Sequence, residues 1–131
     1  MHFMSAEETE RIKQQLNDLK AEMPEIEGIA VLTKEGLPIA SIFSTIDPAI
    51  LSAITATLNN VSEKAMEELQ KGLLETVIVQ GEQGHLVVQE IGTSAVIAVL
   101  ASKSAKPGLL YILVNRVSDK LADFLHFNTK L

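Results

Sequence analysis

LETVIVQGEQGHLVVQEIGTSAVIAVLA, residues 74–101, is the segment around which the rest of this chain can be arranged. It contains three short runs rich in β-branched residues, separated by glycine-bounded turns at residues 81–84 and 92–94. This pattern predicts three strands joined by two tight turns. The third run, Ala95–Leu100, is apolar at every position, so we expect it inside a sheet, with a covering layer over each face or a further strand beyond it.

A helix is predicted at the beginning of the chain, from Ser5 to Met23. Ser5 and Glu8 have the spacing of a capping box, in which each side chain satisfies a backbone amide of the other. Apolar residues then recur at helical spacing along one face. Pro24 cannot continue a helix, so we expect the helix to end just before it.

A β-hairpin is predicted next, with strands at residues 28–32 and 37–43. Gly36 supplies the backbone freedom that the bend requires. Because Pro38 has no amide hydrogen to give to a neighbouring strand, the returning strand is expected at the edge of the sheet. The first strand of the hairpin is then expected on the inner side of it.

A long central helix is predicted from Asp47, its N-cap, and Pro48 to about Lys71, where Gly72 ends it. One stripe is apolar and is expected to lie on the sheet: Leu51, Ile54, Leu58, Val61, Ala65 and Leu69. The opposite side of the first half is small and uncharged: Ala49, Ala53, Ala56 and Asn60. A helix that is small or apolar all round is usually buried all round, so we expect a helix–helix contact between subunits here. The alternative is an ordinary alanine-rich exposed helix.

The last helix is predicted to begin at Pro107-Gly108 and to continue to about Phe127. Its expected buried face consists of Leu110, Leu113, Val114, Val117, Leu121, Phe124 and Leu125. The element order is therefore helix, hairpin, helix, three-stranded meander, helix. No repeat or linker divides the chain, so residues 1–131 are expected to form one domain with its core at about residues 5–125.

Composition excludes several classes of function. The formal net charge of −6 argues against non-specific binding to nucleic acid or to an anionic membrane. There is no cysteine, so disulfides and thiolate metal sites are ruled out. No apolar run approaches the roughly 20 residues of a membrane span, and the first residues are too short for a signal peptide, so a cytoplasmic protein is expected. Hydrophobic residues make up 47% but aromatic residues only 4%, which hints at a self-associating face.

No catalytic, cofactor or metal site is predicted. The sequence has no nucleophile elbow, phosphate-binding loop or dinucleotide fingerprint. The turn 81–84 matches a Gly-x-x-Gly nucleic-acid clamp, but it carries Glu82 and has no basic flank, so a hairpin turn is the better interpretation. His85 is expected to be hydrogen-bonded or solvent-facing. Arg11 and Arg116 could act as arginine fingers on a bound GTPase, but a surface or ion-pair role is favoured because both lie on helices.

The chain resembles a roadblock/dynein light chain domain over roughly Ser5 to Leu125. The hairpin segment EGIAVLTKEGLPIAS, residues 27–41, is similar to the family's glycine, apolar strand, short polar turn and second strand ending in Ala-Ser. The strand at residues 86–88, the apolar strand at 95–100 and the helix after Pro107-Gly108 continue the resemblance.

This resemblance implies an α+β fold. It consists of a five-stranded antiparallel sheet, with the long helix on one face and the N- and C-terminal helices on the other. It also implies a homodimer, or a pair with another roadblock subunit, formed by the long helices and by the outer strand of the meander near Val77 and Val79. Together with Ala49, Ala53, Ala56 and Asn60, these two residues are the predicted interface.

Relatives of this kind act as scaffolds or regulators of Ras-like small GTPases, so the resemblance implies a non-enzymatic GTPase-binding platform, with at most a weak activating effect on hydrolysis within a complex. Two alternatives remain open. One is a structural adaptor that does not read the nucleotide, and the other is a small-molecule sensor of the profilin or PAS type. The scarcity of aromatic residues disfavours the sensor.

Overall fold

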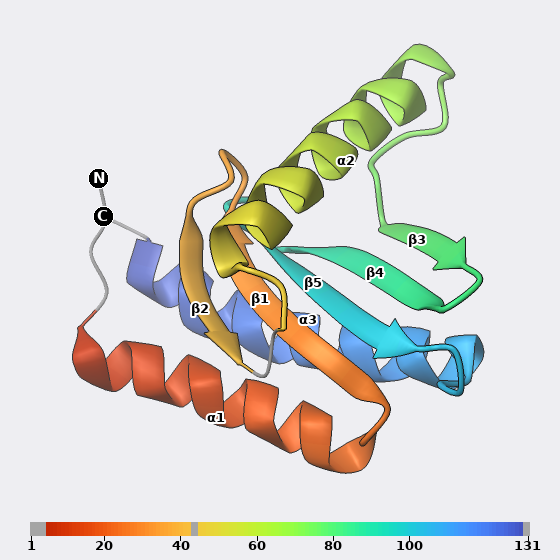
Figure 1. The fold of residues 1–131 in the computed structure, drawn as a ribbon. Coiled ribbons are helices and arrows are strands. Elements are labelled where there is room, and N and C mark those ends of the chain that lie inside the picture. Colours follow the sequence, from red (N-terminus) through yellow and green to blue (C-terminus); the bar gives the residue numbers. More distant parts are fainter. Residues whose placement is uncertain (1–4, 43–44, 130–131) are drawn as a thin grey trace.

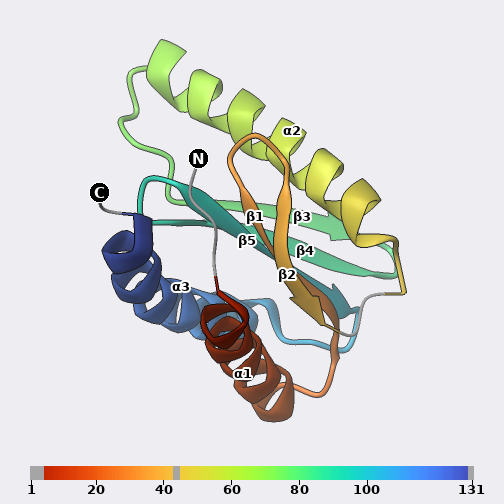
Figure 2. The ribbon, with the colours of Figure 1, turned by 90° about the vertical axis from the view of Figure 1, so that its left-hand side faces the viewer.

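The structure, a computed structural model, describes residues 5–42 and 45–129, with side chains up to residue 125. The elements are α1 (Ala6–Glu22), β1 (Ile26–Thr33), β2 (Pro38–Ile42), α2 (Pro48–Glu68), β3 (Thr76–Gly81), β4 (Gly84–Ile91), β5 (Ala95–Ser102) and α3 (Pro107–Thr129). The strands form one antiparallel sheet in the order β2-β1-β5-β4-β3, with α2 on one face and α1 and α3 on the other (Figures 1 and 2). The predicted fold class and element order are confirmed.

The middle of the sheet is β5, as its apolar sequence predicts. It pairs with β1 from Ile26↔Ala101 to Thr33↔Ala95 and with β4 on its other side, and its residues 95–99 are all buried. Strand β2 lies at one edge and begins at Pro38, as expected for a residue that cannot donate to a neighbouring strand. The predicted end of that strand, Phe43, lies outside the described residues. No helix among the described residues is long and apolar enough to cross a membrane.

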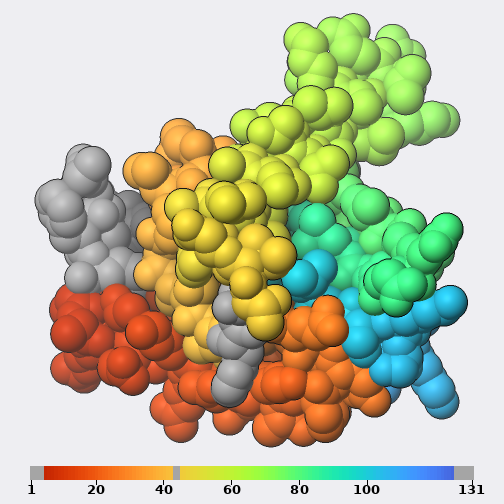
Figure 3. All heavy atoms as spheres, viewed as in Figure 1, coloured from red at the N-terminus to blue at the C-terminus, as the bar shows by residue number. Residues whose placement is uncertain are grey.

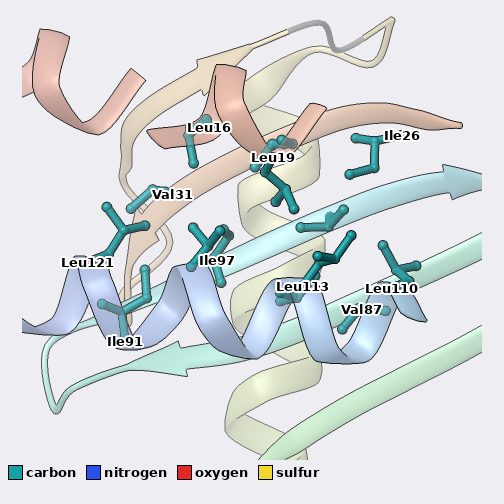
Figure 4. Packing of buried hydrophobic residues seen from close by; sticks show 14 of the residues in the cluster. Leu16, Leu19, Ile26, Val31, Val87, Ile91, Ile97, Leu110, Leu113 and Leu121 are labelled. Carbon is teal, nitrogen blue, oxygen red and sulfur yellow. The ribbon is translucent and has the colours of Figure 1, made fainter. Parts of the chain in front are cut away.

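The larger core fills the space between the sheet and the helices α1 and α3 (Figure 4). The capping box of α1 is present: the amide of Ser5 donates to Glu8 Oε1 at 2.8 Å, and the amide of Glu8 donates to Ser5 Oγ at 3.1 Å. The predicted apolar face of α3 is buried except for Phe124, which is half-buried and lies 4.3 Å below the Arg11 guanidinium.

The smaller core lies under α2 and corrects the predicted orientation of that helix. It consists of Ala30, Leu32, Leu51, Ala56, Val88, Val96 and Ala98. Ile54, Val61 and Leu69 are exposed, so the expectation that they lie on the sheet is wrong. The side that faces the sheet carries Ser52, Thr55, Ala56 and Asn59, and is turned by roughly a third of a turn from the predicted stripe. Small side chains there let the helix come close to the sheet.

The end of α2 also differs from the prediction. The helix stops at Glu68 instead of about Lys71, and its C-cap is Leu69. Gln70 then takes a left-handed conformation with φ of 57°, and the amide of Lys71 donates to the carbonyl of Met66 at 2.8 Å. This hydrogen bond is typical of a helix end whose left-handed position is usually a glycine. Gly72, at φ of 87°, lies in the connection that follows.

Candidate protein-interaction surface

The outward side of α2 and the residue before its N-cap carry large apolar side chains without any charge. We call the set Ile46, Ile50, Ala53, Ile54, Thr57 and Val61 the outer stripe. All six residues are exposed, Ile50 at 54% and Val61 at 64%. On α2, Ile50, Ala53, Thr57 and Val61 follow one another at intervals of three and four residues, and Ile54 lies four residues after Ile50 and three before Thr57, so these five share one side of the helix. Contiguous exposed apolar surface of this kind is typical of protein–protein interfaces.

The predicted interface residues of α2 do not all lie on the surface. Ala49, Ala53 and Asn60 are exposed, and Ala53 belongs to the outer stripe. Ala56 is only 6% exposed, because the β1–β2 turn packs against it: a Cβ built at Gly36 would lie 3.3 Å from the Cβ of Ala56. Ala56 is therefore a core residue of the protomer, and its place in the predicted interface is a correction.

Strand β3 forms the second part of this surface. It is the last strand of the sheet, and within the described part of the chain its outer side pairs with no other strand. Val79 is exposed, whereas Val77 is half-buried against the smaller core. An edge strand without proline or lysine leaves its backbone groups open to pairing with another strand.

A polar cluster holds the middle of α2 to the sheet, and the sequence analysis did not find it. Lys34, in the β1–β2 turn, lies 3.2 Å from a carboxylate oxygen of Glu63 on α2 and 3.5 Å from one of Glu90 on β4. Asn59 Nδ2 donates to Glu90 at 3.0 Å. The alternation of side chains along β4 places Glu90 on the same face of the sheet as Leu86 and Val88. This alternation was the one feature of the sequence that could have predicted a glutamate beneath α2.

The two carboxyl groups of this cluster titrate differently. Burial, and then the hydrogen bond shared with Glu63, raises the pKa of Glu90 above its usual 4.5. That same hydrogen bond, with help from the Lys34 ammonium, lowers the pKa of Glu63. Burial would lower the pKa of Lys34, but the two carboxylates outweigh it and raise the pKa above 10.5. Within the cluster, the environment therefore favours the protonated form of Glu90 and the ionised form of Glu63.

Next to the cluster, α2 buries polar atoms that are not satisfied. Ser52 Oγ, Thr55 Oγ1 and Asn59 Oδ1 are buried and have no hydrogen-bond partner among the described residues. A buried polar atom in this state costs about 1–3 kcal/mol. On this side of the sheet, these three atoms offset part of the stability gained from the apolar contacts of the smaller core.

The other sequence candidates lie away from the outer stripe. Arg11 stacks on Phe124, and Arg116 lies 3.4 Å from Glu22, so both arginines are engaged between α1 and α3, as the favoured interpretation predicted. His85 is only 9% exposed, and its Nδ1 has no partner within the described residues, which corrects the expectation of a satisfied or solvent-facing side chain. Among the described residues there is no group of three or more His, Cys, Asp or Glu side chains that could hold a metal ion.

Comparison with known proteins agrees with this architecture. Residues 12–101 match the model of the Roadblock/LC7 domain family. The chain belongs to this family. The match covers most of the domain, from the middle of α1 to the end of the central strand β5, and so includes both parts of the interaction surface.

Relatives of this Roadblock/LC7 chain occur in archaea and bacteria. The protein MJ0310 of Methanocaldococcus jannaschii, which is itself uncharacterised, is 29% identical over 97 residues, or 73% of this chain and 84% of the relative. The structure of MglB from Myxococcus xanthus has a TM-score of 0.87 at 19% identity and covers 98% of both chains. Another MglB structure, described as having a tetrameric arrangement, has a TM-score of 0.87 at 17% identity and covers 97% of this chain and 96% of its own.

Proposed function

We propose that this chain is a dimeric interaction platform that binds and regulates a Ras-like small GTPase and performs no chemistry of its own. The dimer is a homodimer or a pair with another Roadblock/LC7 subunit. It forms through the outer stripe of α2 and the free edge of β3. Family membership supports the GTPase as the partner class, and the tetrameric arrangement of one MglB is a precedent for self-association.

The observation that carries the proposal is the outer stripe itself. Ile50, Ile54 and Val61 leave about half or more of their side chains in water, so each forgoes about half of the roughly 1.5–3 kcal/mol that complete burial of a side chain of this size gains. The same helix buries Ser52 and Thr55 instead. Large apolar side chains on the outer side of a helix that buries hydroxyl groups against its own sheet support a partner over that outer side.

Regulation requires that the platform distinguish the two nucleotide states. Binding shifts an equilibrium between GTP-bound and GDP-bound conformations only by the ratio of its affinities for the two. To reverse a 1:99 population completely, that ratio has to be about ten-thousandfold, whereas a ratio of ten is enough for selective recruitment. The measurable signature of a regulator is therefore a difference between affinities.

The test is made in two steps. Light scattering during gel filtration, over a dilution series, should give twice the chain mass of 14.2 kDa. The dimer is then immobilised and offered purified Ras-like GTPases from the same organism, each loaded with GDP or with a non-hydrolysable GTP analogue. Capture that depends on the nucleotide supports the proposal. Equal capture of both forms would leave the structural adaptor, and no capture of any of them would overturn GTPase binding.

A further inference from the structure

The corner between α2 and β3 is unlike the rest of the surface. It projects from the body of the molecule at the end of α2, the upper part of Figure 3. Leu73 is 94% exposed, the highest value among the large exposed hydrophobic residues of the described chain, and Leu69 is 63% exposed. The packing of the protomer does not explain why Leu69 and Leu73 are exposed to solvent at this corner.

A hollow of about 660 Å³ lies at this corner. It is lined by Glu63, Glu67, Gln70, Gly72, Leu73 and Leu74. The two glutamates are four residues apart on α2 and therefore share one side of the helix. The two leucines come from the connection that follows. The lining thus combines carboxylates with apolar surface, and none of its residues is basic.

The carboxylates of the hollow are in different states. Glu63 is already paired with Lys34 at 3.2 Å, so part of its charge is neutralised. Glu67 is exposed, and although its backbone carbonyl accepts a hydrogen bond from the amide of Gln70 at 3.1 Å, its carboxylate has no hydrogen bond or ion pair among the described residues. Lys64, which could have been its partner, reaches Glu68 instead at 3.7 Å. The hollow therefore offers one acceptor whose charge is not compensated.

The backbone at Gln70 shapes the hollow. Gln70 is the one non-glycine residue with a positive φ among those described, at 57°, a conformation that favours glycine or asparagine. This turn ends α2 and reverses the chain, so that Leu73 and Leu74 line the same hollow as Glu63 and Glu67. A strained residue at an exposed corner is a reason to look for a function there.

We propose that this hollow is a docking site for a segment of a partner protein that carries an arginine or lysine beside a leucine-like side chain. Long basic side chains have an apolar stem and a charged end, which match the leucines and Glu67 respectively. The neighbouring apolar side chain of the segment covers Leu73. This site is separate from the outer stripe and does not depend on the GTPase proposal.

The test uses the full-length protein labelled with ¹⁵N and the peptide acetyl-Gly-Leu-Arg-Leu-Gly-amide. The control is the same peptide with citrulline in place of arginine, which keeps the shape and removes the charge. We expect the arginine peptide to move the amide signals of residues 63–74, with a dissociation constant on the order of 1 mM. Glu67→Lys should weaken binding about tenfold, because an attraction becomes a repulsion. Glu10→Lys, an exposed change on α1, should leave binding unchanged.

Several results would overturn the docking site. They are an equal response to the citrulline peptide, shifts confined to other residues, and unchanged binding by Glu67→Lys. Leu73→Ser, which should fold normally because its side chain is exposed, should weaken binding and keep the wild-type mass in light scattering. A halved mass would show instead that a second copy of the chain covers the corner. Failure to capture a GTPase would count against the proposed function alone, since the peptide assay contains none.

Discussion

Arginine substitutions at Ala53 and Ala56 separate the subunit interface from the core of the protomer. The two alanines are three residues apart on α2, yet Ala53 is exposed in the outer stripe and Ala56 is 6% exposed against the β1–β2 turn. Ala53→Arg should give a folded monomer. Ala56→Arg should destabilise the protomer itself.

The magnitudes follow from the surroundings. At Ala53 the guanidinium reaches solvent in the monomer, so the free energy of unfolding changes little. In the dimer it lies unpaired among apolar side chains, at a cost of about 3 kcal/mol, and the dimer dissociates roughly a hundredfold more readily. At Ala56 a larger side chain meets the turn at Gly36, where a single Cβ would already be 3.3 Å away. Overpacking and a buried charge cost about 3 kcal/mol, or about 10 °C in melting temperature.

Light scattering and thermal unfolding of the same samples test both statements. Ala53→Arg is expected at a mass of one chain, 14.2 kDa, with circular dichroism like that of the wild type. Ala53→Ser serves as the control and should stay dimeric. An Ala53→Arg protein that dissociates over the same dilution range as the wild type would refute the outer stripe as the interface. An Ala56→Arg protein with an unchanged melting temperature would refute the position of α2.

Three further changes test the packing. Gly84→Ala places a Cβ against the carbonyl oxygen of Ala101, so the free energy of unfolding should fall by about 1–3 kcal/mol, and an unchanged urea midpoint would contradict this contact. Ile97→Ala leaves a cavity at a fully buried residue, with 0% exposure, and should lower the free energy of unfolding by about 2–5 kcal/mol in the same assay. A smaller loss would mean that the neighbouring side chains move in to fill the cavity. The raised pKa of Glu90 means that the folded protein holds this proton more tightly than the unfolded chain, so the contribution of Glu90 to stability declines as the pH rises from about 4.5 through the raised pKa. Glu90→Gln removes this decline, so the variant should gain stability relative to the wild type as the pH rises above 4.5. A difference between the two proteins that does not grow with pH would contradict the raised pKa of Glu90.

The sheet was predictable because its signals are local. Runs of β-branched residues between glycines mark β3, β4 and β5, and Pro38 marks an edge, so the strands and the place of β5 could be derived from the sequence. The capping box of α1 and the N-cap of α2 depend on two or three neighbouring residues and were equally accessible.

The orientation of α2 was not predictable in the same way. Hydropathy ranks Ile54 and Val61 as core residues and Ser52 and Asn59 as surface residues, and the structure reverses both assignments. Periodicity shows that a helix has an apolar stripe but does not say whether its own sheet or another surface covers that stripe. The end of α2 was missed for a related reason, because Gln70 takes a conformation that is usually reserved for glycine.

The pairing of β1 with β5 has a consequence for how the chain folds. The hairpin β1–β2 and the meander β3–β4–β5 each consist of neighbours in sequence, whereas the β1–β5 contact joins the two ends of a long loop that contains α2. Non-local pairing is slow, so we expect closure of this loop to limit the folding rate. Its entropic cost rises by only about 0.6 kcal/mol for each doubling of loop length. The connection that contains α2, and with it the interaction surface, can therefore change in length at little cost to the pairing of β1 with β5.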